Sequence, residues 1–199
     1  MLPALIIFSH ENDIDDETKL VNELFNHGME FFHLRKPGWS SSDQIKYLSQ
    51  INPEYLNKIS IHQHYASAQE FNLSYIHVKE KARADFEARQ FSNYKLSTSF
   101  HQAELIEKES KQWHHCFLSP VFNSISKKDY TSEFGNNFKI NNPNKNIYAL
   151  GGITQHHVAD AIAMGFSGVA ALGAIWSLPG SIIENFTALN EICKLHVPL

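Results

Sequence analysis

The chain has 199 residues, of which 43% are hydrophobic, and a formal net charge of −4 with the histidines neutral. This length fits one domain, expected to span residues 1–199, and the apolar content is enough for a sizeable buried core. No dense run of Lys or Arg appears, so nucleic acid and anionic membranes are not expected partners. The apolar run near the start is broken by Pro3, is too short to cross a bilayer and lacks a preceding basic segment.

Two cysteines, Cys116 and Cys193, lie far apart in apolar surroundings and lack the spacing of metal ligands. We interpret them as buried free thiols. Together with the absence of a leader-like or membrane-spanning segment, this predicts a cytoplasmic protein.

Strand-like apolar runs alternate with helix-like runs along the whole chain. The first helix-like run has Asn12 or Asp13 as its expected cap and Gly28 after its end, and Ser40 to Ser42 are candidate caps of the second. The spacing predicts strands over 4–8, 29–35, 59–63, 75–78, 94–99, 113–118, 147–150 and 168–172. It predicts helices over 13–26, 40–50, 65–71, 102–110, 154–164 and about 182–195.

Eight alternations of strand and helix are typical of parallel strands joined by right-handed crossovers. They predict a compact α/β domain, a (β/α)8 TIM barrel. An open doubly wound sheet is the alternative, because no clear helix follows the sixth strand. The glycine-rich ends of the last two strands favour the barrel.

Glycines follow the seventh and eighth strands, where such barrels commonly bind phosphate. Gly151 and Gly152 come after one strand, and Gly173 and Ala174 after the other. Glycine lets the backbone approach a phosphate closely, and N–H groups at a helix N-terminus can donate to it. These four residues form the predicted phosphate site; the alternative is that the glycines only make tight turns.

Polar residues alternate with apolar ones on four successive strands. Helices cover the outside of a barrel, so we expect the polar faces to point inward and line a ligand cavity. For any single histidine, a hydrogen-bonded core residue is the alternative. The inward pairs are His33 and Arg35, Ser60 and His62, Tyr75 and His77, and Ser97 and Ser99.

The segment after the sixth strand, residues 123–146, has no clear apolar period and is rich in Asn, Ser and Lys. Irregular segments of this length are often functional lids, although a solvated loop is the default. Ser124, Ser126 and Lys127 at its start could hold a diphosphate.

Taken in order, these segments resemble the thiamine-phosphate synthase/TenI family along nearly the whole chain. The similar segments are His33-Leu34-Arg35-Lys36-Pro37 (family Gln-x-Arg-Glu-Lys), Ile61-His62-Gln63-His64 (family Asn-Asp-Arg), Ser97-Thr98-Ser99-Phe100-His101 (family Gly-x-Ser-x-His), Ser119-Pro120-Val121-Phe122 with Ser124, Ser126 and Lys127 (family Gly-Pro-x-Phe-x-Thr-x-Thr-Lys), and the two glycine turns.

The resemblance implies a homodimeric synthase that joins an aminopyrimidine diphosphate to a thiazole phosphate and releases diphosphate. It implies diphosphate or substrate contacts from Arg35, Ser99, Ser124, Ser126 and Lys127. The TenI branch of the family instead isomerises the thiazole with a histidine as acid/base. The candidates for that role are His33, His62, His77 and His101.

Several positions depart from the family pattern. Gln63 and Ala82 stand where the resemblance places the two metal-binding aspartates, and Pro120 stands at the position of the TenI histidine. Magnesium is therefore expected only if synthase activity is retained, and no metal ligand is predicted. Three functions stay open: the synthase, a metal-independent thiazole isomerase, and a non-catalytic binder of a phosphorylated thiamine precursor. A Schiff-base aldolase, which needs a lysine nucleophile, is disfavoured, because Lys95 is the only lysine in the fifth and sixth predicted strands and lies near a strand start.

Overall fold

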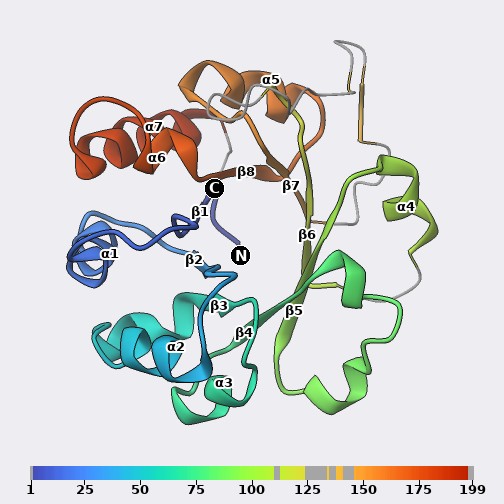
Figure 1. Ribbon diagram of the computed structural model, residues 1–199. Coiled ribbons are helices and arrows are strands. Elements are labelled where there is room, and N and C mark those ends of the chain that lie inside the picture. The colour runs from blue at the N-terminus through green and yellow to red at the C-terminus, as the bar shows by residue number, and fades with distance from the viewer. Residues whose placement is uncertain (1, 110–112, 124–133, 135–137, 141–145, 197–199) are drawn as a thin grey trace.

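A computed structural model describes residues 2–109, 113–123, 134, 138–140 and 146–196. Eight parallel strands close into one barrel in the order β1 to β8, with β8 pairing back onto β1. Figure 1 looks into this ring of strands and shows the helices around its outside. The predicted TIM barrel is confirmed, and the open doubly wound sheet is wrong.

The strands are short, as in most barrels of this type, and each crossover carries the chain back along the outside. The strands are β1 (Leu5–Phe8), β2 (Phe32–Leu34), β3 (Ile59–Ile61), β4 (Tyr75–Val78), β5 (Lys95–Phe100), β6 (His115–Leu118), β7 (Ile147–Leu150) and β8 (Gly168–Ala171). The α-helices are α1 (Glu17–Asn26), α2 (Ser41–Leu48), α3 (Ala66–Glu70), α4 (Ala103–Lys108), α5 (Val158–Ala163), α6 (Gly173–Trp176) and α7 (Ile182–His196). Short 3-10 turns are η1 (Pro53–Lys58), η2 (Glu80–Ala82), η3 (Ala88–Phe91) and η4 (Gln155–His157).

Two apolar clusters follow from the alternation of side chains along each strand. The larger cluster fills the layer between strands and helices and contains, for example, Ile7, Leu34 and Ile76. The smaller cluster fills the barrel interior and includes Phe8, Phe117 and Tyr148. The interior is thus a packed core, and its polar members are embedded among aromatic rings.

The start of the first helix was predicted wrongly. Helix α1 begins at Glu17, its N-cap is Asp16, and no side chain caps it. Asn12 and Asp13 instead bind the chain that follows β2: the Asn12 carbonyl accepts from Lys36 Nζ, and the Asp13 carboxylate accepts from the indole of Trp39. These contacts hold residues 12 and 13 in an irregular connection before the helix, which a local capping pattern does not reveal.

The second helix begins as predicted. The Ser40 side chain accepts from the Asp43 backbone N–H, and the Asp43 carboxylate accepts from the Ser40 backbone N–H, which together form a capping box. The strand β2 is shorter than the predicted 29–35 and leaves Arg35 just beyond its end.

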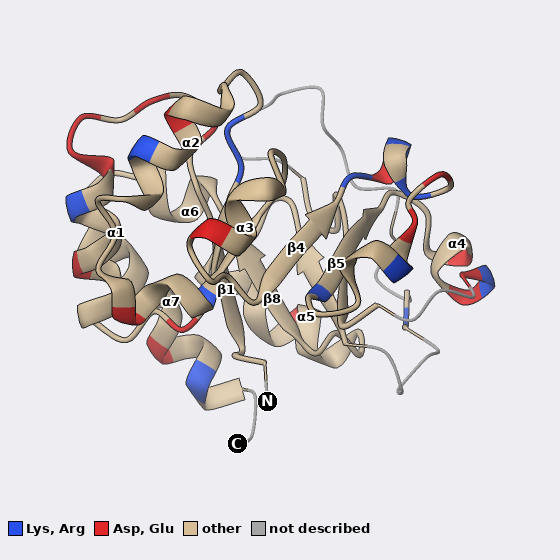
Figure 2. Ribbon diagram, turned by 90° about the horizontal axis from the view of Figure 1, so that it is seen from below, with Lys and Arg blue, Asp and Glu red and all other residues tan. Residues whose placement is uncertain are grey.

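Between β6 and β7, the described part of the chain contains no helix, which agrees with the missing sixth helix in the sequence pattern. Cys116 and Cys193 are buried free thiols, as predicted. Among the described helices, none has the length and apolar character needed to cross a membrane. Figure 2 shows the barrel from the side with both termini at the bottom, and acidic and basic segments intermixed along the upper edge.

Candidate active site at the carboxyl ends of the strands

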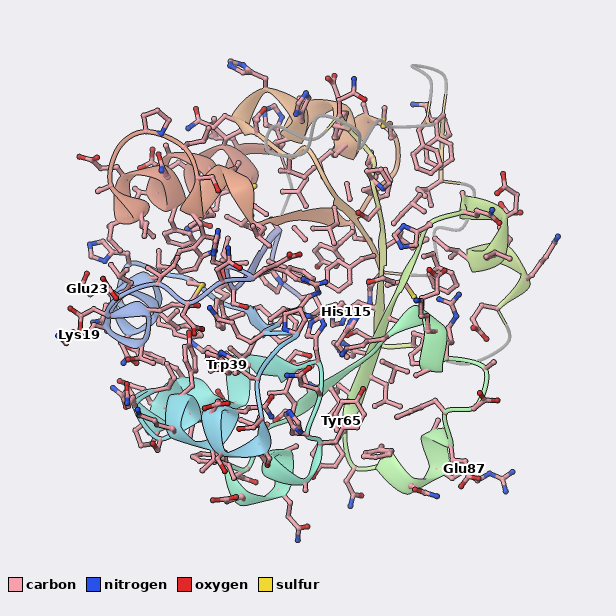
Figure 3. The ribbon with its side chains drawn as sticks, in the orientation of Figure 1. Lys19, Glu23, Trp39, Tyr65, Glu87 and His115 are labelled. Carbon is pink, nitrogen blue, oxygen red and sulfur yellow. The ribbon has the colours of Figure 1, made fainter. Side chains whose placement is uncertain are left out.

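Four histidines from four strands meet inside the barrel. They are His33 on β2, His62 just after β3, His77 on β4 and His115 on β6, here called the histidine cluster, and each is at most 3% exposed. The barrel register places His33 beside Ser60 and His77 beside Ser97. Figure 3 shows His115 at the centre of the ring of strands. The inward direction predicted for His33, His62 and His77 is confirmed. These side chains are packed among aromatic rings, whereas the sequence pattern predicted that they line a ligand cavity.

The cluster is connected by short nitrogen–nitrogen contacts and ring packing. His33 Nδ1 lies 3.0 Å from His62 Nε2, and His33 Nε2 lies 3.4 Å from His115 Nε2. The rings of His62 and His77 are stacked with centroids 4.1 Å apart. Phe8 stacks on His33 at 4.7 Å. His33 therefore shares hydrogen bonds with His62 and His115, and the four rings pack within an aromatic cage.

Burial keeps these imidazoles neutral. It lowers the pKa of His33, His62 and His115 well below the usual value, and neighbouring imidazoles add to the effect. Burial also lowers the pKa of His77 to about 3, with smaller contributions from the charges of Arg35 and Lys79. A neutral imidazole offers one N–H donor and one lone pair, so the cluster can relay hydrogen bonds without carrying charge.

His77 connects the cluster to the open end of the barrel. Its Nδ1 lies 2.9 Å from Ser97 Oγ and its Nε2 lies 3.2 Å from Ser99 Oγ. Ser97 is buried, whereas Ser99 is partly exposed near the carboxyl end of β5. The coordinating nitrogens of His33, His62 and His77 lie within 4.8 Å of one another, so these three could hold a metal ion, although both nitrogens of His77 already have serine partners.

Basic side chains stand at the ends of β2 and β4. Arg35 NH1 donates to the carboxylate of Glu11 at 2.6 Å, and the Arg35 backbone exchanges two hydrogen bonds with the Ser9 hydroxyl. Lys79 Nζ lies 3.4 Å from Oε1 of Gln63. Arg35 and Lys79 thus bring two positive charges to the open end of the barrel formed by the carboxyl ends of the strands, here called the mouth.

The turn after β7 requires glycine. Gly151 and Gly152 have φ of 90° and 68°, the left-handed region that favours glycine. A Cβ on Gly152 would lie 2.4 Å from the Asn123 carbonyl oxygen, and one on Gly151 would lie 2.8 Å from Pro120 Cα. The turn therefore packs directly against the backbone that follows β6.

On the neighbouring strand end, Gly173 and Ala174 begin α6 immediately after β8. The strands β7 and β8 are paired through Leu150 and Ala170, so the two glycine-containing turns are adjacent. Within the described residues, no acceptor is found for the backbone N–H groups of Gly152, Gly173 or Ala174. With respect to the described part of the chain, these N–H groups could donate to an anion.

Four further residues were predicted to belong to the site, namely Ser124, Ser126, Lys127 and His101. Ser124, Ser126 and Lys127 lie outside the described residues. His101 is not part of the histidine cluster: its Nδ1 lies 2.6 Å from the Ser119 carbonyl oxygen, and its Nε2 lies 3.4 Å from a Glu80 carboxylate oxygen.

The sequence interpretation missed two features of this region. His115 was not recognised as an inward residue, although it alternates with Cys116 in the same way as the other three. The buried ion pair between Lys36 and Glu17, which Tyr47 joins at 3.3 Å, was also missed. Because Lys36 is committed to Glu17, its ammonium is not directed to the mouth.

Comparison with known proteins agrees with the barrel fold. A crystal structure of thiamine phosphate pyrophosphorylase from Bacteroides thetaiotaomicron is 24% identical, covers 96% of this chain and 98% of its own, and has a TM-score of 0.74. A thiamine phosphate pyrophosphorylase from Pyrococcus furiosus is 13% identical, covers 98% and 96%, and has a TM-score of 0.77. At these identities the two structures show a shared fold.

None of the curated proteins matches the sequence. The profile of the TMP-TENI family, described as thiamine monophosphate synthase, matches residues 4–175, which is most of the chain. The chain therefore belongs to the TMP-TENI family of thiamine monophosphate synthases.

Proposed function

We propose that the chain joins an aminopyrimidine diphosphate to a thiazole phosphate, forming thiamine phosphate and releasing diphosphate. The observation that carries the proposal is the pair of adjacent turns after β7 and β8. There, the N–H groups of Gly152, Gly173 and Ala174 have no acceptor among the described residues. Backbone donors of this kind are suited to the phosphate of the thiazole substrate.

The aminopyrimidine diphosphate is assigned to the side of the mouth opposite the glycine turns. In a closed barrel of eight strands, β3 lies opposite β7, so the cations after β2 and β4 stand across the mouth from the glycine turns. Arg35 and Ser99 are the proposed contacts of the diphosphate among the described residues. Ser124, Ser126 and Lys127 are proposed to join them by resemblance.

In the proposed reaction, positive charge develops on the pyrimidine between the diphosphate contacts and the glycine turns. The bond between the pyrimidine methylene carbon and the diphosphate oxygen breaks, and its electron pair leaves with the diphosphate. The thiazole nitrogen then donates its lone pair to the methylene carbon, which forms the new C–N bond. The neutral imidazoles of His33, His62 and His77 lie below this point and add no positive charge under the cationic intermediate.

Magnesium does not fit the residues at the two positions where the family resemblance places metal carboxylates. Gln63 Nε2 donates to the backbone carbonyls of Lys36 at 2.6 Å and Trp39 at 3.3 Å, and its oxygen faces the Lys79 ammonium. Ala82 offers an exposed methyl group. A neutral amide beside an ammonium is a poor ligand for Mg²⁺, which is held through carboxylates. The proposed reaction therefore uses the chain's own side chains.

Thiazole isomerisation is the second candidate, favoured by the hydrogen-bonded path from Ser99 through His77 to Ser97. It ranks below the synthase for two reasons. Pro120 has no proton to exchange, and burial makes His77 a weak base, since its pKa is lowered to about 3. A non-catalytic binder of the thiazole phosphate is the third candidate, and a homodimer is the assembly that the resemblance implies.

The test is turnover by purified protein. Both substrates are supplied, and thiamine phosphate and diphosphate are quantified together. We expect equal amounts of the two products, and a loss of at least tenfold in kcat/KM for Ser99→Ala. Isomerisation of the thiazole without condensation would favour the second candidate, and calorimetric binding without any turnover would favour the third.

A further inference from the structure

Gln63 is held in one orientation by backbone carbonyls. Its side-chain nitrogen donates to Lys36 O and Trp39 O, so the amide oxygen is the atom left to face the mouth. That oxygen lies 3.4 Å from Lys79 Nζ, and Lys79 directly follows β4. An ammonium therefore stands where the family resemblance places a metal carboxylate and its ion.

Arg35 and Lys79 face the same part of the barrel. Arg35 follows His33 by two residues at the end of β2, and Lys79 follows His77 by two residues at the end of β4. His62 joins these strand ends, because its Nε2 lies 3.0 Å from His33 Nδ1 and its ring stacks on His77 with centroids 4.1 Å apart. The two cations reach this part of the barrel from different strand ends, β2 and β4. Their convergence is a property of the barrel, because the residues are far apart in the sequence.

The carboxylates near these cations leave an excess of positive charge. Glu11 pairs with Arg35 at 2.6 Å. Across the described ranges of the chain, no carboxylate forms an ion pair with Lys79, whereas the neighbouring cation Lys36 is neutralised by Glu17. Lys79 is thus the cation at this edge whose charge is available to an incoming anion.

We propose that Lys79, together with Arg35, takes the place of the metal and binds the diphosphate group of the substrate directly, so that this chain recognises metal-free diphosphate. The inference rests on the proposed function and names the group that compensates the leaving charge. Two monovalent cations at fixed positions neutralise part of the diphosphate charge, and charge-assisted hydrogen bonds from both add direction. Binding should therefore weaken as salt is added.

The experiment is calorimetric titration of inorganic diphosphate into the full chain in the presence of a chelator. Lys79→Met is compared with Lys81→Met, which removes an exposed lysine two positions further along. We expect wild-type protein and the Lys81 variant to bind alike and the Lys79 variant to bind at least tenfold more weakly, with partial recovery in Lys79→Arg.

Magnesium should not strengthen this binding. Binding that appears only with magnesium, or equal affinities for the wild type and the Lys79 variant, would overturn the inference. Titration of thiazole phosphate into the same proteins separates it from the proposed function. If thiazole phosphate binds and the two variants do not differ for diphosphate, the role of Lys79 is wrong and the phosphate site stands. If thiazole phosphate fails to bind, the proposed function itself fails.

Discussion

The histidine cluster should make the protein unstable in mild acid. Histidines in the unfolded chain take up protons near pH 6.5, about their usual pKa, whereas His33, His62, His77 and His115 have lowered pKa values in the fold. The unfolded state thus binds more protons below that pH. Stability is fully present above about pH 6.5 and is lost as the pH falls toward the folded-state values.

The size of the effect can be worked out for His77, because its pKa in the fold is about 3. Each pH unit below about 6.5 costs about 1.4 kcal/mol, so at pH 5 this residue alone removes about 2 kcal/mol. The other three histidines act in the same direction. A loss of about 2 kcal/mol is already a large fraction of the total stability of a typical domain, which is about 5–15 kcal/mol. We therefore expect a clear loss of stability between about pH 6.5 and pH 5.

Urea unfolding at several pH values measures this directly. His115→Gln removes one buried imidazole away from the mouth, so its stability should depend on pH less steeply than that of the wild type, by about 1.4 kcal/mol per pH unit. Leu105→Gln, which changes an exposed side chain that does not titrate, should leave the slope unchanged. If wild-type protein is as stable at pH 5 as at pH 7.5, the cluster is not held neutral and the reasoning is refuted.

Three further predictions follow from single contacts. Gly152→Ala would bring a Cβ within 2.4 Å of a backbone oxygen, so we expect at least tenfold weaker calorimetric binding of thiazole phosphate, whereas Gly38→Ala, with nothing within 4 Å, should be neutral. Lys36→Met leaves the buried Glu17 without its cation and should cost about 3 kcal/mol in urea unfolding, much of it recovered when Glu17 is also replaced by Gln. Burial raises the pKa of Cys193 to about 12, so a thiol reagent should label it only on unfolding, and rapid labelling of native protein would contradict its buried position.

The barrel and its inward polar face were predictable because both depend on short-range alternation. A period of two residues places His33, His62 and His77 on one side of their strands, and helices must cover the other side. His115 escaped notice because its face also carries Phe117, so the strand reads as apolar. One imidazole beside an aromatic ring looks like ordinary core packing until the fold brings three others to it.

The contacts that require glycine after β7, and the pairing of Lys36 with buried Glu17, were not predictable from the sequence. Gly152 needs its small size because Phe122 and Asn123 pass against it, and this contact joins two segments about 30 residues apart in the sequence. Lys36 directly follows Arg35, a predicted diphosphate contact, yet its ammonium is directed to Glu17. Such choices of partner depend on the angles at which the strands leave the barrel, which local patterns do not contain.

The central claim is condensation without magnesium, and its most direct test is the rate of thiamine phosphate formation in excess chelator compared with excess magnesium. The account predicts that the two kcat/KM values lie within about twofold of each other, because Lys79 and Arg35 bind the diphosphate in place of the ion. A twofold difference corresponds to less than about 0.5 kcal/mol in activation free energy. Product that forms only with magnesium would contradict it. Groups other than Lys79 and Arg35 would then have to hold the ion.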